Sequence, residues 1–541
     1  MNALMRFSLA VVSAISLVGC DNTTVDHSAI RKTGFVYCGQ GNLTTFNPQL
    51  VDSGITVEAL SPQLFDTLLV IDPTTLQPRS NIAQSWTVDD SGTEYTFYLR
   101  SGVQFHHTSW FTPSRTLNAF DVKFSFDRIL NKKHPYHNVS GGSYPWFSGT
   151  NFEELVKEVR VVDDNTVTFI LRKPDNSFLS NIATPHAAIF SEEYAQTLLQ
   201  ERHPEKLDMM PIGTGPFYLD EFQANDFIRL KRNEFYWQTP AKLQQVVFDI
   251  SQRGTGTLAK LLLNECDVLS TPISSQIPVI KQQEHIKLSA TPAMNVAFIA
   301  VNTNHPVLHD ANLRKAISLA INRDNILNSV YYGTGSIAYN LLPPSSWAYQ
   351  IESSQIRFDR HYAMRLIESS GLKDSLHLTM LVPLEPTAYN PSPRKTAELI
   401  QANLKDVGIN LTIVPEEKID RQNRAKRDDV DLFLTGWTGR TGDPDSFLRP
   451  VLSCHARTQG INLSKWCNQD FDSLLDLALE ANKQRYRKNL YHQAQNIVYQ
   501  QFPVIPLAHG MQFRAYNTSL EGLGSNPFHV QPFTNVDRVE E

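Results

Sequence analysis

The sequence predicts a mixed α/β fold, with strands concentrated in the first third and helices alternating with strands later on. Residues 94–100 and 166–171 alternate apolar and polar side chains, the period of two that is typical of half-buried strands. Between about 310 and 440, apolar positions at helical spacing alternate with short strand-like segments. This alternation favours a βαβ layer with helices on the faces of a sheet.

Turn and cap residues delimit the expected elements. Asp90-Ser91-Gly92 and Asp163-Asp164-Asn165 precede the two early strands. Asp310 is expected to cap a helix, and Ser392-Pro393 to open another that ends before Gly408. The remaining expectations are strands at 410–414 and 430–434, a mostly helical segment at 471–500 and an extended segment at 502–507.

Length and composition limit the classes of protein to which this chain can belong. The chain has 541 residues, of which 41% are hydrophobic and 19% charged, an ordinary composition for a folded chain of several domains. Its formal net charge of -6 argues against a nucleic-acid partner. No repeat or Gly/Ser linker divides it, so we expect domains joined by crossing strands.

The N-terminus has the layout of a secretory signal peptide. An apolar segment at 7–18 follows a basic residue and is too short to span a membrane. Leu17-Val18-Gly19-Cys20 resembles a bacterial lipoprotein box, which predicts a signal peptide at 1–19 and lipidation of Cys20. Asp21 then indicates a tether at the inner membrane. The alternative is a plain signal peptide that happens to contain a cysteine.

The other four cysteines are Cys38, Cys266, Cys454 and Cys467. An even number in an exported chain predicts two disulfides because the periplasm is oxidising, and three connectivities are possible. Zinc is disfavoured because no two of these cysteines are two to four residues apart. We expect neither a metal nor another cofactor.

The familiar catalytic motifs are missing from the sequence. It contains no G-x-S-x-G, H-E-x-x-H, C-x-x-C or phosphate-binding loop. His106-His107 lies beside a strand end, where adjacent side chains point to opposite faces. Pro444 favours a rigid turn over an acid/base pair of Asp443 and Asp445. We therefore expect a binding protein rather than an enzyme.

Segments along nearly the whole chain resemble the extracellular solute-binding proteins of peptide ABC transporters, the branch with dipeptide- and oligopeptide-binding proteins. They are AQSW at 83–86, NAFDVKFSF at 118–126, PIGTGPF at 211–217, residues 302–322, GWTG at 436–439 and GDPD at 442–445. Further segments are similar to the subfamily of the Sap transporters, which is associated with handling antimicrobial peptides. They are GFVYC at 34–38, WFTPSR at 110–115, SWAY at 346–349, NPSP at 390–393 and SFLRP at 446–450.

The resemblance implies a type II periplasmic-binding-protein fold with a discontinuous domain I, an inserted domain II and a domain III. Their boundaries are 20–65, 215–292 and 511–541 for domain I, 66–214 for domain II and 293–510 for domain III. Domains I and III are expected to enclose a cleft, with hinge strands near 292 and 510. The resemblance also implies disulfides Cys38–Cys266 and Cys454–Cys467.

The implied function is non-catalytic. A monomeric periplasmic protein binds an extended peptide chiefly through its main chain and delivers it to the permease subunits of an ABC transporter. One alternative is a dipeptide- or haem-binding protein of the dipeptide branch. Others are an envelope sensor or adaptor on the same scaffold, and an exported hydrolase, which needs a nucleophile or metal that the sequence does not offer.

The expected binding site departs from that of dipeptide-binding relatives. There, an aspartate after Gly-Trp-Thr-Gly pairs with the ligand's amino terminus, and an arginine two residues before a tyrosine clamps its carboxylate. Here Arg440 and Thr387 occupy these positions, while Tyr389 is kept. Repulsion by Arg440 and loss of the carboxylate clamp predict that free dipeptides are not preferred. The alternative is a register shift that lets Asp443 serve as the acid.

Three more residues complete the candidate ligand-binding set: Gly436, Trp437 and Tyr144. Trp437 and Tyr389 offer aromatic walls to a ligand, with core packing as the alternative for each. Tyr144, in Gly141-Gly142-Ser143-Tyr144, is the candidate from domain II.

Overall fold

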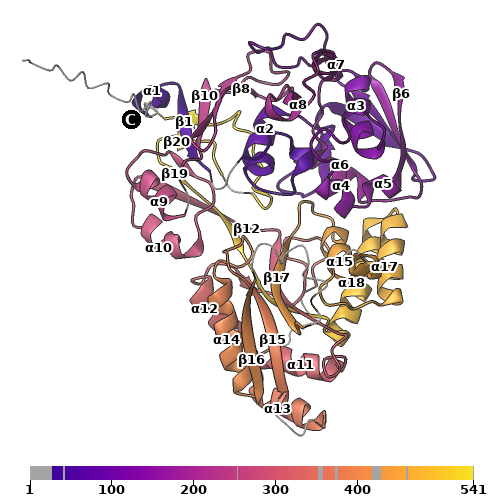
Figure 1. Cartoon of the computed structure of the whole chain (residues 1–541), viewed down its shortest axis with the longest axis vertical. Helices are drawn as coiled ribbons and strands as arrows, with labels where there is room; N and C mark the ends of the chain where they lie inside the picture. The colour runs from indigo at the N-terminus through magenta and orange to yellow at the C-terminus, as the bar shows by residue number, and fades with distance from the viewer. Residues whose placement is uncertain are drawn as a thin grey trace, which may run out of the picture.

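The computed structural model describes residues 27–39, 43–252, 254–350, 357–371, 376–416, 427, 429–458, 461–524 and 526–539. The expected signal peptide and Cys20 lie outside these residues, so lipidation of Cys20 stays a prediction. The described chain forms three larger sheets with their helices (Figure 1). The seven-stranded and four-stranded sheets make up an upper lobe, and the six-stranded sheet forms a lower lobe.

The seven-stranded sheet has the order β12-β19-β11-β1-β10-β9-β8. Its strands are β1 (Gly34–Cys38), β8 (Phe217–Gln223), β9 (Phe227–Arg232), β10 (Gln245–Asp249), β11 (Val268–Leu269), β12 (Ile286–Pro292) and β19 (Met511–Asn517). They come from three separate parts of the chain. Elements of the same lobe include α1 (His27–Arg31), η2 (Thr56–Leu60), α2 (Ser61–Leu64), β2 (Leu69–Ile71), β3 (Pro78–Ser80), α9 (Thr255–Leu262), α10 (Ile277–Ile280), β20 (Leu520–Glu521) and β21 (Asp537–Arg538).

The four-stranded sheet is antiparallel, with the order β4-β5-β7-β6. It contains β4 (Ala83–Val88), β5 (Glu94–Leu99), β6 (Val156–Asp163) and β7 (Thr166–Leu171), with α3 (Ala119–Leu130), α4 (Pro145–Gly149), α5 (Phe152–Leu155), α6 (Phe178–Ile182), α7 (Glu192–Gln200) and α8 (Lys206–Met209) around it. The two strands predicted from alternation are therefore confirmed, and they pair with each other. Phe97 and Phe169 pack with Phe126 of α3 because alternate side chains share one face.

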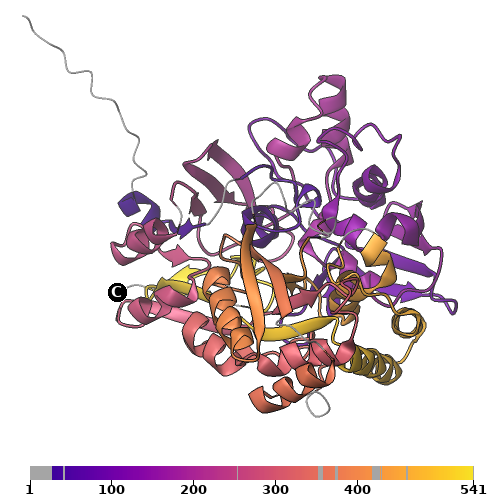
Figure 2. The same ribbon diagram turned by 60° about the horizontal axis from the view of Figure 1, so that its bottom comes forward.

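The six-stranded sheet has the order β14-β18-β13-β17-β15-β16 and is covered on both faces (Figure 2). Its strands are β13 (Asn295–Val301), β14 (Ser336–Ile337), β15 (Leu376–Pro383), β16 (Ile409–Glu416), β17 (Leu432–Thr438) and β18 (Val504–His509). One face packs on α11 (Ala311–Ala320), α12 (Arg323–Val330), α13 (Arg360–Ser369) and α14 (Pro393–Lys405). The other face packs on α15 (Asp445–Leu452), α17 (Gln469–Glu480) and α18 (Gln484–Gln501).

The helices and parallel strands expected in this region are present. β15 and β16 run parallel and are connected through α14, so the βαβ prediction is confirmed. The side chain of Asp310 accepts the amide of Asn312 and caps α11. The segment predicted as mostly helical at 471–500 is divided into α17 and α18, because Ala481 at the end of α17 adopts an extended conformation.

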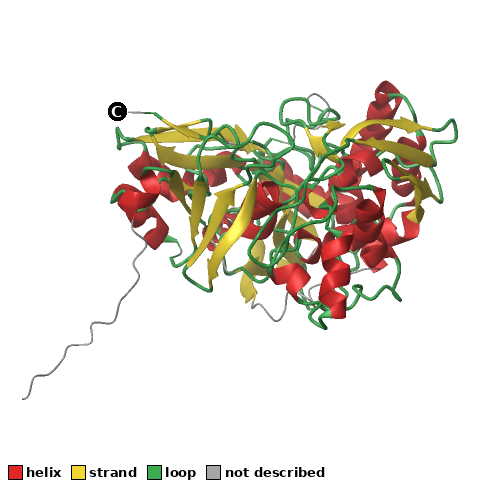
Figure 3. Ribbon diagram, turned by 90° about the horizontal axis from the view of Figure 1, so that it is seen from above, coloured by secondary structure: helices red, strands yellow, loops and turns green. Residues whose placement is uncertain are grey.

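The chain crosses between the lobes from β12 to β13 and from β18 to β19. The two crossings touch: Ala293 N donates to Gly510 O at 3.1 Å, and Gly510 N donates to Asn295 Oδ1 at 2.8 Å. They lie at the positions expected for the hinge. Seen from above, long loops lie in the middle of the molecule, with helices and strands on both sides of them (Figure 3).

Both disulfides implied by the resemblance are formed. Cys38, at the end of β1, is bonded to Cys266, just before β11. Cys454 of α16 (Cys454–Thr458) is bonded to Cys467, just before α17. The first bond fastens neighbouring strands of the seven-stranded sheet, and the second closes a short loop of the lower lobe.

Asp267 ties both ends of the described chain to the upper lobe, so replacing it should destabilise the fold. Its carboxylate, 1% exposed, lies 3.3 Å from Arg31 of α1 and 3.3 Å from Arg538 of β21, and accepts the amide of Val36. We expect Asp267→Asn to lower the free energy of unfolding by about 2 kcal/mol, because a buried charged acceptor is lost. Thermal denaturation followed by circular dichroism measures the effect.

The control is Asp72→Asn, which removes the carboxylate that faces Arg79 at 3.9 Å on the surface. The substituted side chain keeps an oxygen that can accept the amides of Thr74 and Thr75, so the thermal midpoint should stay close to that of the wild type. Equal losses from the two substitutions would contradict the role given to Asp267.

Asp175 should make the protein less stable as the pH rises from about 4 to about 6. Burial, and then the nearby Asp445 carboxylate, raise its pKa to about 6 from a usual value of 3.8. The folded form therefore holds a proton in this window that the unfolded form releases, and the stabilisation present at low pH is lost as the pH rises. Asp175→Asn keeps an acceptor for the amide and hydroxyl of Ser177, so the variant should show a smaller decline and a higher thermal midpoint at pH 7.

Asp89→Asn serves as the control for this titration. Hydrogen bonds from Ser91 and Glu94 lower the pKa of the Asp89 carboxyl to about 2, below the window. The ordinary pKa of 3.8 that this carboxyl has in the unfolded form also lies below pH 5, so its removal should leave the slope between pH 5 and 6 unchanged. If the wild-type and Asp175→Asn slopes coincide, Asp175 does not titrate as described.

Candidate ligand-binding cleft

A cavity of about 300 Å³ lies where the two lobes meet. The upper lobe contributes the end of β1, residues 54–59 and residues 270–274; the lower lobe contributes Asn295, Tyr331, the 386–391 loop and the end of β17. The crossing segments, at Ala293 and residues 510–513, and residues 527–529 complete the lining. We call this cavity the cleft. Since it is bounded by both lobes and by their connections, any relative movement of the lobes changes its size.

An ion pair joins the two sides of the cleft. Arg440 follows β17 in the lower lobe, and its Nη1 donates to Glu58 Oε1 of η2 in the upper lobe at 3.2 Å. The two side chains are only 12% and 25% exposed, so the pair is partly shielded from water. Among the described lining residues these are the only acid and the only Lys or Arg, and their charges cancel.

The histidine of the lining carries no charge at neutral pH. Burial, followed by the positive charges of Arg514 and Arg440, holds the pKa of His529 well below its usual value. The remaining polar groups of the lining are hydroxyls, amides and main-chain groups. This electrostatically balanced surface suits a ligand that is recognised by hydrogen bonds rather than by terminal charges.

Arg440 and Thr387, the two positions that depart from dipeptide-binding relatives, both line the cleft. The hydroxyl of Thr387 is used within its own turn, where it accepts the amide of Asn390 at 3.0 Å. Neither residue therefore offers the charge that a zwitterionic dipeptide requires at that place. The structure brings the two substituted positions to one cavity, as the resemblance implies.

Tyr389 and Gly436 fasten the 386–391 loop beside the cleft. The tyrosine ring packs on Gly436 so closely that a Cβ there would lie 2.2 Å from its Cδ2 atom. The hydroxyl of Tyr331 donates to Tyr389 O at 2.6 Å. The two candidates are thus in contact with each other and support the lining from behind, without belonging to it.

Trp437 and Tyr144 lie outside the cleft lining. Trp437 projects from the opposite face of β17 to Thr438, packs against the lower-lobe core and donates its indole N–H to Ser446 O at 2.7 Å. This placement matches the core-packing alternative. Tyr144 is buried near α3, and its hydroxyl donates to His137 O at 3.0 Å.

Asp443, the alternative acid, also faces away from the cleft. It is buried in the lower lobe, where Arg487 Nη2 approaches its Oδ2 at 2.7 Å and the hydroxyl of Tyr491 donates to its Oδ1 at 3.3 Å. The carboxylate is therefore already paired, and the register-shift alternative finds no support in this geometry.

Sequence reasoning missed Glu58 and Asn295. Asn295 binds Ala388 O at 3.0 Å through its Nδ2 atom and Gly510 N through its Oδ1 atom, so it connects the 386–391 loop to the second crossing. Its position at the first residue of a strand after a crossing was the one available signal. Glu58 lies 382 residues from Arg440, and no local pattern connects the two.

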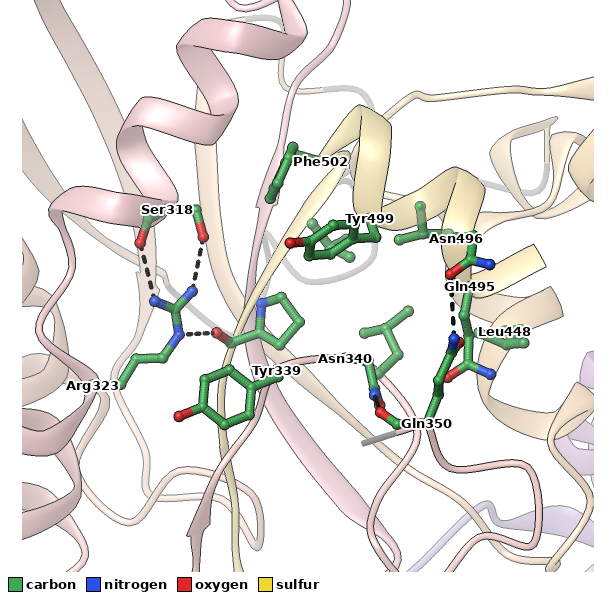
Figure 4. A pocket seen from close by; sticks show the side chains of 14 residues that line it. Ser318, Arg323, Tyr339, Asn340, Gln350, Leu448, Gln495, Asn496, Tyr499 and Phe502 are labelled. Atoms are coloured by element: carbon green, nitrogen blue, oxygen red, sulfur yellow. Dashed lines mark hydrogen bonds between the residues drawn. The ribbon is translucent and has the colours of Figure 1, made fainter. Parts of the chain in front are cut away.

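A smaller cavity in the lower lobe is separate from the cleft (Figure 4). Its volume of about 40 Å³ suits a few water molecules at most, not a peptide. Figure 4 shows Arg323 donating to the carbonyl and hydroxyl of Ser318 and to Pro506 O, at 3.0, 2.9 and 2.7 Å. Burial lowers the pKa of this guanidinium to about 10. The buried charge is thus satisfied by the fold itself.

In the described part of the chain, no group of three or more His, Cys, Asp or Glu side chains is arranged to hold a metal ion. Within the same residues, no helix is both long enough and apolar enough to cross a bilayer.

Comparisons with known proteins agree with this architecture. The family described as bacterial extracellular solute-binding proteins, family 5 Middle, matches residues 77–459. A peptide transport periplasmic protein, SapA, of Salmonella typhimurium is 43% identical over 94% of this chain and 92% of its own. The dipeptide-binding protein of Escherichia coli is 39% identical over 98% of this chain and 99% of its own.

Solved structures show the same arrangement. The dipeptide-binding protein of Pseudoalteromonas sp. SM9913, in complex with Met-Leu, superposes with a TM-score of 0.83 at 36% identity, covering 93% of this chain and 99% of that chain. A match of this extent covers both lobes and the cleft between them. The chain therefore belongs to family 5 of the bacterial extracellular solute-binding proteins.

Proposed function

We propose that this protein captures peptides in the cleft, in the periplasm, and delivers them unchanged to the permease of an ABC transporter. The observation that carries the proposal is a cavity enclosed by two lobes, in whose described lining the only acid and the only Lys or Arg are paired with each other and the other residues carry no charge at neutral pH. Peptide main chains match such a lining because every peptide carries the same amides and carbonyls. The printed names of the relatives, peptide transport and dipeptide binding, support the same class of cargo.

Movement of the lobes about the two crossings would admit and enclose the cargo. Hinge closure concentrates backbone rotation in a few residues at element ends, and Ala293, Asn295 and Gly510 occupy such places. Ligand stabilises the closed arrangement only by the amount that it binds this arrangement more tightly than the open one. The Arg440–Glu58 pair spans the cleft, so opening of the lobes would separate these two side chains.

The proposal also includes the kind of peptide that is bound and the attachment of the protein to the membrane. The similarity to proteins of the Sap type favours antimicrobial peptides as cargo. Lipidation of Cys20 would hold the protein at the inner membrane, next to the permease; several acyl chains provide the stable anchor that one chain does not.

Protein purified from the periplasm should carry peptides that native mass spectrometry resolves as discrete added masses. After release by acid, their fragmentation spectra should show intact peptides, and re-incubation with the protein should leave these masses unchanged. Small-angle scattering should report a smaller radius of gyration with cargo than without it, since closure compacts the two lobes. Adducts of another chemical class, or cleaved peptides, would contradict the proposal.

Simple dipeptides should bind poorly to the wild type. Calorimetry with Gly-Leu or Ala-Phe should give no binding in the micromolar range, because the described lining offers no free acid for the ammonium group and has Thr387 at the place where a cation would clamp the carboxylate. The double variant Arg440→Asp/Thr387→Arg should bind the same dipeptides at least tenfold more tightly, equivalent to about 1.4 kcal/mol.

Arg394→Asp repeats the Arg440→Asp part of this change on the exposed surface of α14, where the Arg394 side chain is 87% exposed, and should leave dipeptide binding at the wild-type level. Micromolar binding of a dipeptide by the wild type would refute this account of Arg440 and Thr387. An equal gain in the Arg394→Asp variant would assign the effect to net charge alone.

A further inference from the structure

A second cavity, of about 250 Å³, adjoins the cleft on the upper lobe. We call it the side chamber. It lies between η2, β2, residues 183–185 and residues 526–534, and exposed lining residues such as Pro73 and Gln238 mark its outer side. Its main apolar side chains are Val57, Phe65, Val70, Ile71, Phe528 and Val530.

The only carboxylate among the described lining residues of the side chamber is already satisfied. The Asp66 carboxylate accepts hydrogen bonds from Asn81 Nδ2 at 3.2 Å, Thr214 Oγ1 at 2.9 Å and Trp237 Nε1 at 2.9 Å. It therefore does not need a ligand to complete its hydrogen bonding. What the chamber offers is mainly apolar surface, and the occupant that gains most from this surface is an apolar one.

The side chamber and the cleft share a thin wall. Arg440 and Phe528 line both cavities. On η2, Val57 faces the chamber whereas its neighbour Glu58 faces the cleft, and Val530 faces the chamber whereas His529 faces the cleft. Adjacent residues of the same segment therefore line different cavities. A ligand held in the cleft is separated from the side chamber by the thickness of one side chain.

Arg440 has hydrogen-bonding capacity to spare at this wall. Its guanidinium has five N–H donors, and in the described structure Glu58 alone accepts a hydrogen bond from it. Donors in a fixed planar arrangement suit carbonyl oxygens of a passing peptide chain. The residue that removes the ammonium site of dipeptide-binding relatives can therefore hold the interior of a longer chain.

We propose that the preferred cargo is a peptide of three or more residues that places one large apolar side chain, aliphatic or aromatic, in the side chamber. Its main chain lies in the cleft and accepts hydrogen bonds from Arg440. This inference rests on the proposed function and adds the length and the apolar residue that the cargo needs. The chamber supplies selectivity because burial of a leucine or phenylalanine side chain is favourable whatever the neighbouring residues are.

The test uses the tetrapeptide Ala-Ala-Ala-Ala and its single-Phe and single-Gly replacements, with affinities measured by calorimetry on the full mature protein. In the wild type, phenylalanine at one position should strengthen binding at least tenfold over glycine at that position. Val70→Trp and Val530→Trp each fill the chamber from a half-buried lining position. Both should abolish this preference while changing the affinity for the glycine peptides by less than about threefold.

Val162→Trp, at a β6 position that is 58% exposed and outside both cavities, is the matched control and should keep the wild-type preference. Thermal denaturation identifies any variant that does not fold, and the two chamber variants test the same point independently. The inference is overturned if the preference survives in both, or if the wild type shows no preference at any position. If no tetrapeptide of the set binds and no peptide co-purifies, the proposed function itself fails.

Discussion

The structure depends on one constraint: the described chain passes between the lobes at two crossings, and these crossings touch each other. Asn295 sits at this meeting point, with its side chain bonded to Gly510 of the other crossing and to the carbonyl of Ala388. The cleft is built directly upon it, since all three residues line the cavity. A rotation at the crossings is therefore transmitted at once to the walls that would hold a ligand.

Because each lobe is rigid, a rotation at the crossings moves the lobe as one unit. The six-stranded sheet is packed with helices on both faces, and every residue of its central strand β13 is buried. The disulfide Cys38–Cys266 and the contacts of Asp267 fasten the seven-stranded sheet close to its chain ends. Close-packed interiors resist gradual deformation, so motion concentrates at the crossings.

The paired charges of Arg440 and Glu58 determine how the cleft can recognise a ligand. The charge of Arg440 is complemented by Glu58 of the opposite lobe. The protein thus closes an ion pair across its own cleft, and the ligand is left to be recognised by shape, hydrogen bonds and apolar surface. The side chamber beyond Arg440 offers mainly apolar surface next to this site.

Local sequence patterns and similarity to the family predicted several helices, strands and site positions of this protein. The alternation of apolar and polar residues predicted β5 and β7, and Asp310 predicted the start of α11. Similarity to the family predicted that Arg440 and Thr387 lie at the cleft. These predictions succeed because strand periodicity and helix capping depend on short-range interactions, and because members of one family share the same backbone fold.

Tertiary structure alone decided the partner of Arg440, the side of β17 on which Trp437 lies and the packing of Tyr389 on Gly436. Each of these joins segments that are far apart in the chain, and such contacts depend on how whole sheets and loops pack rather than on any local pattern. The chamber belongs to the same category, because its walls come from both lobes and from the C-terminal segment.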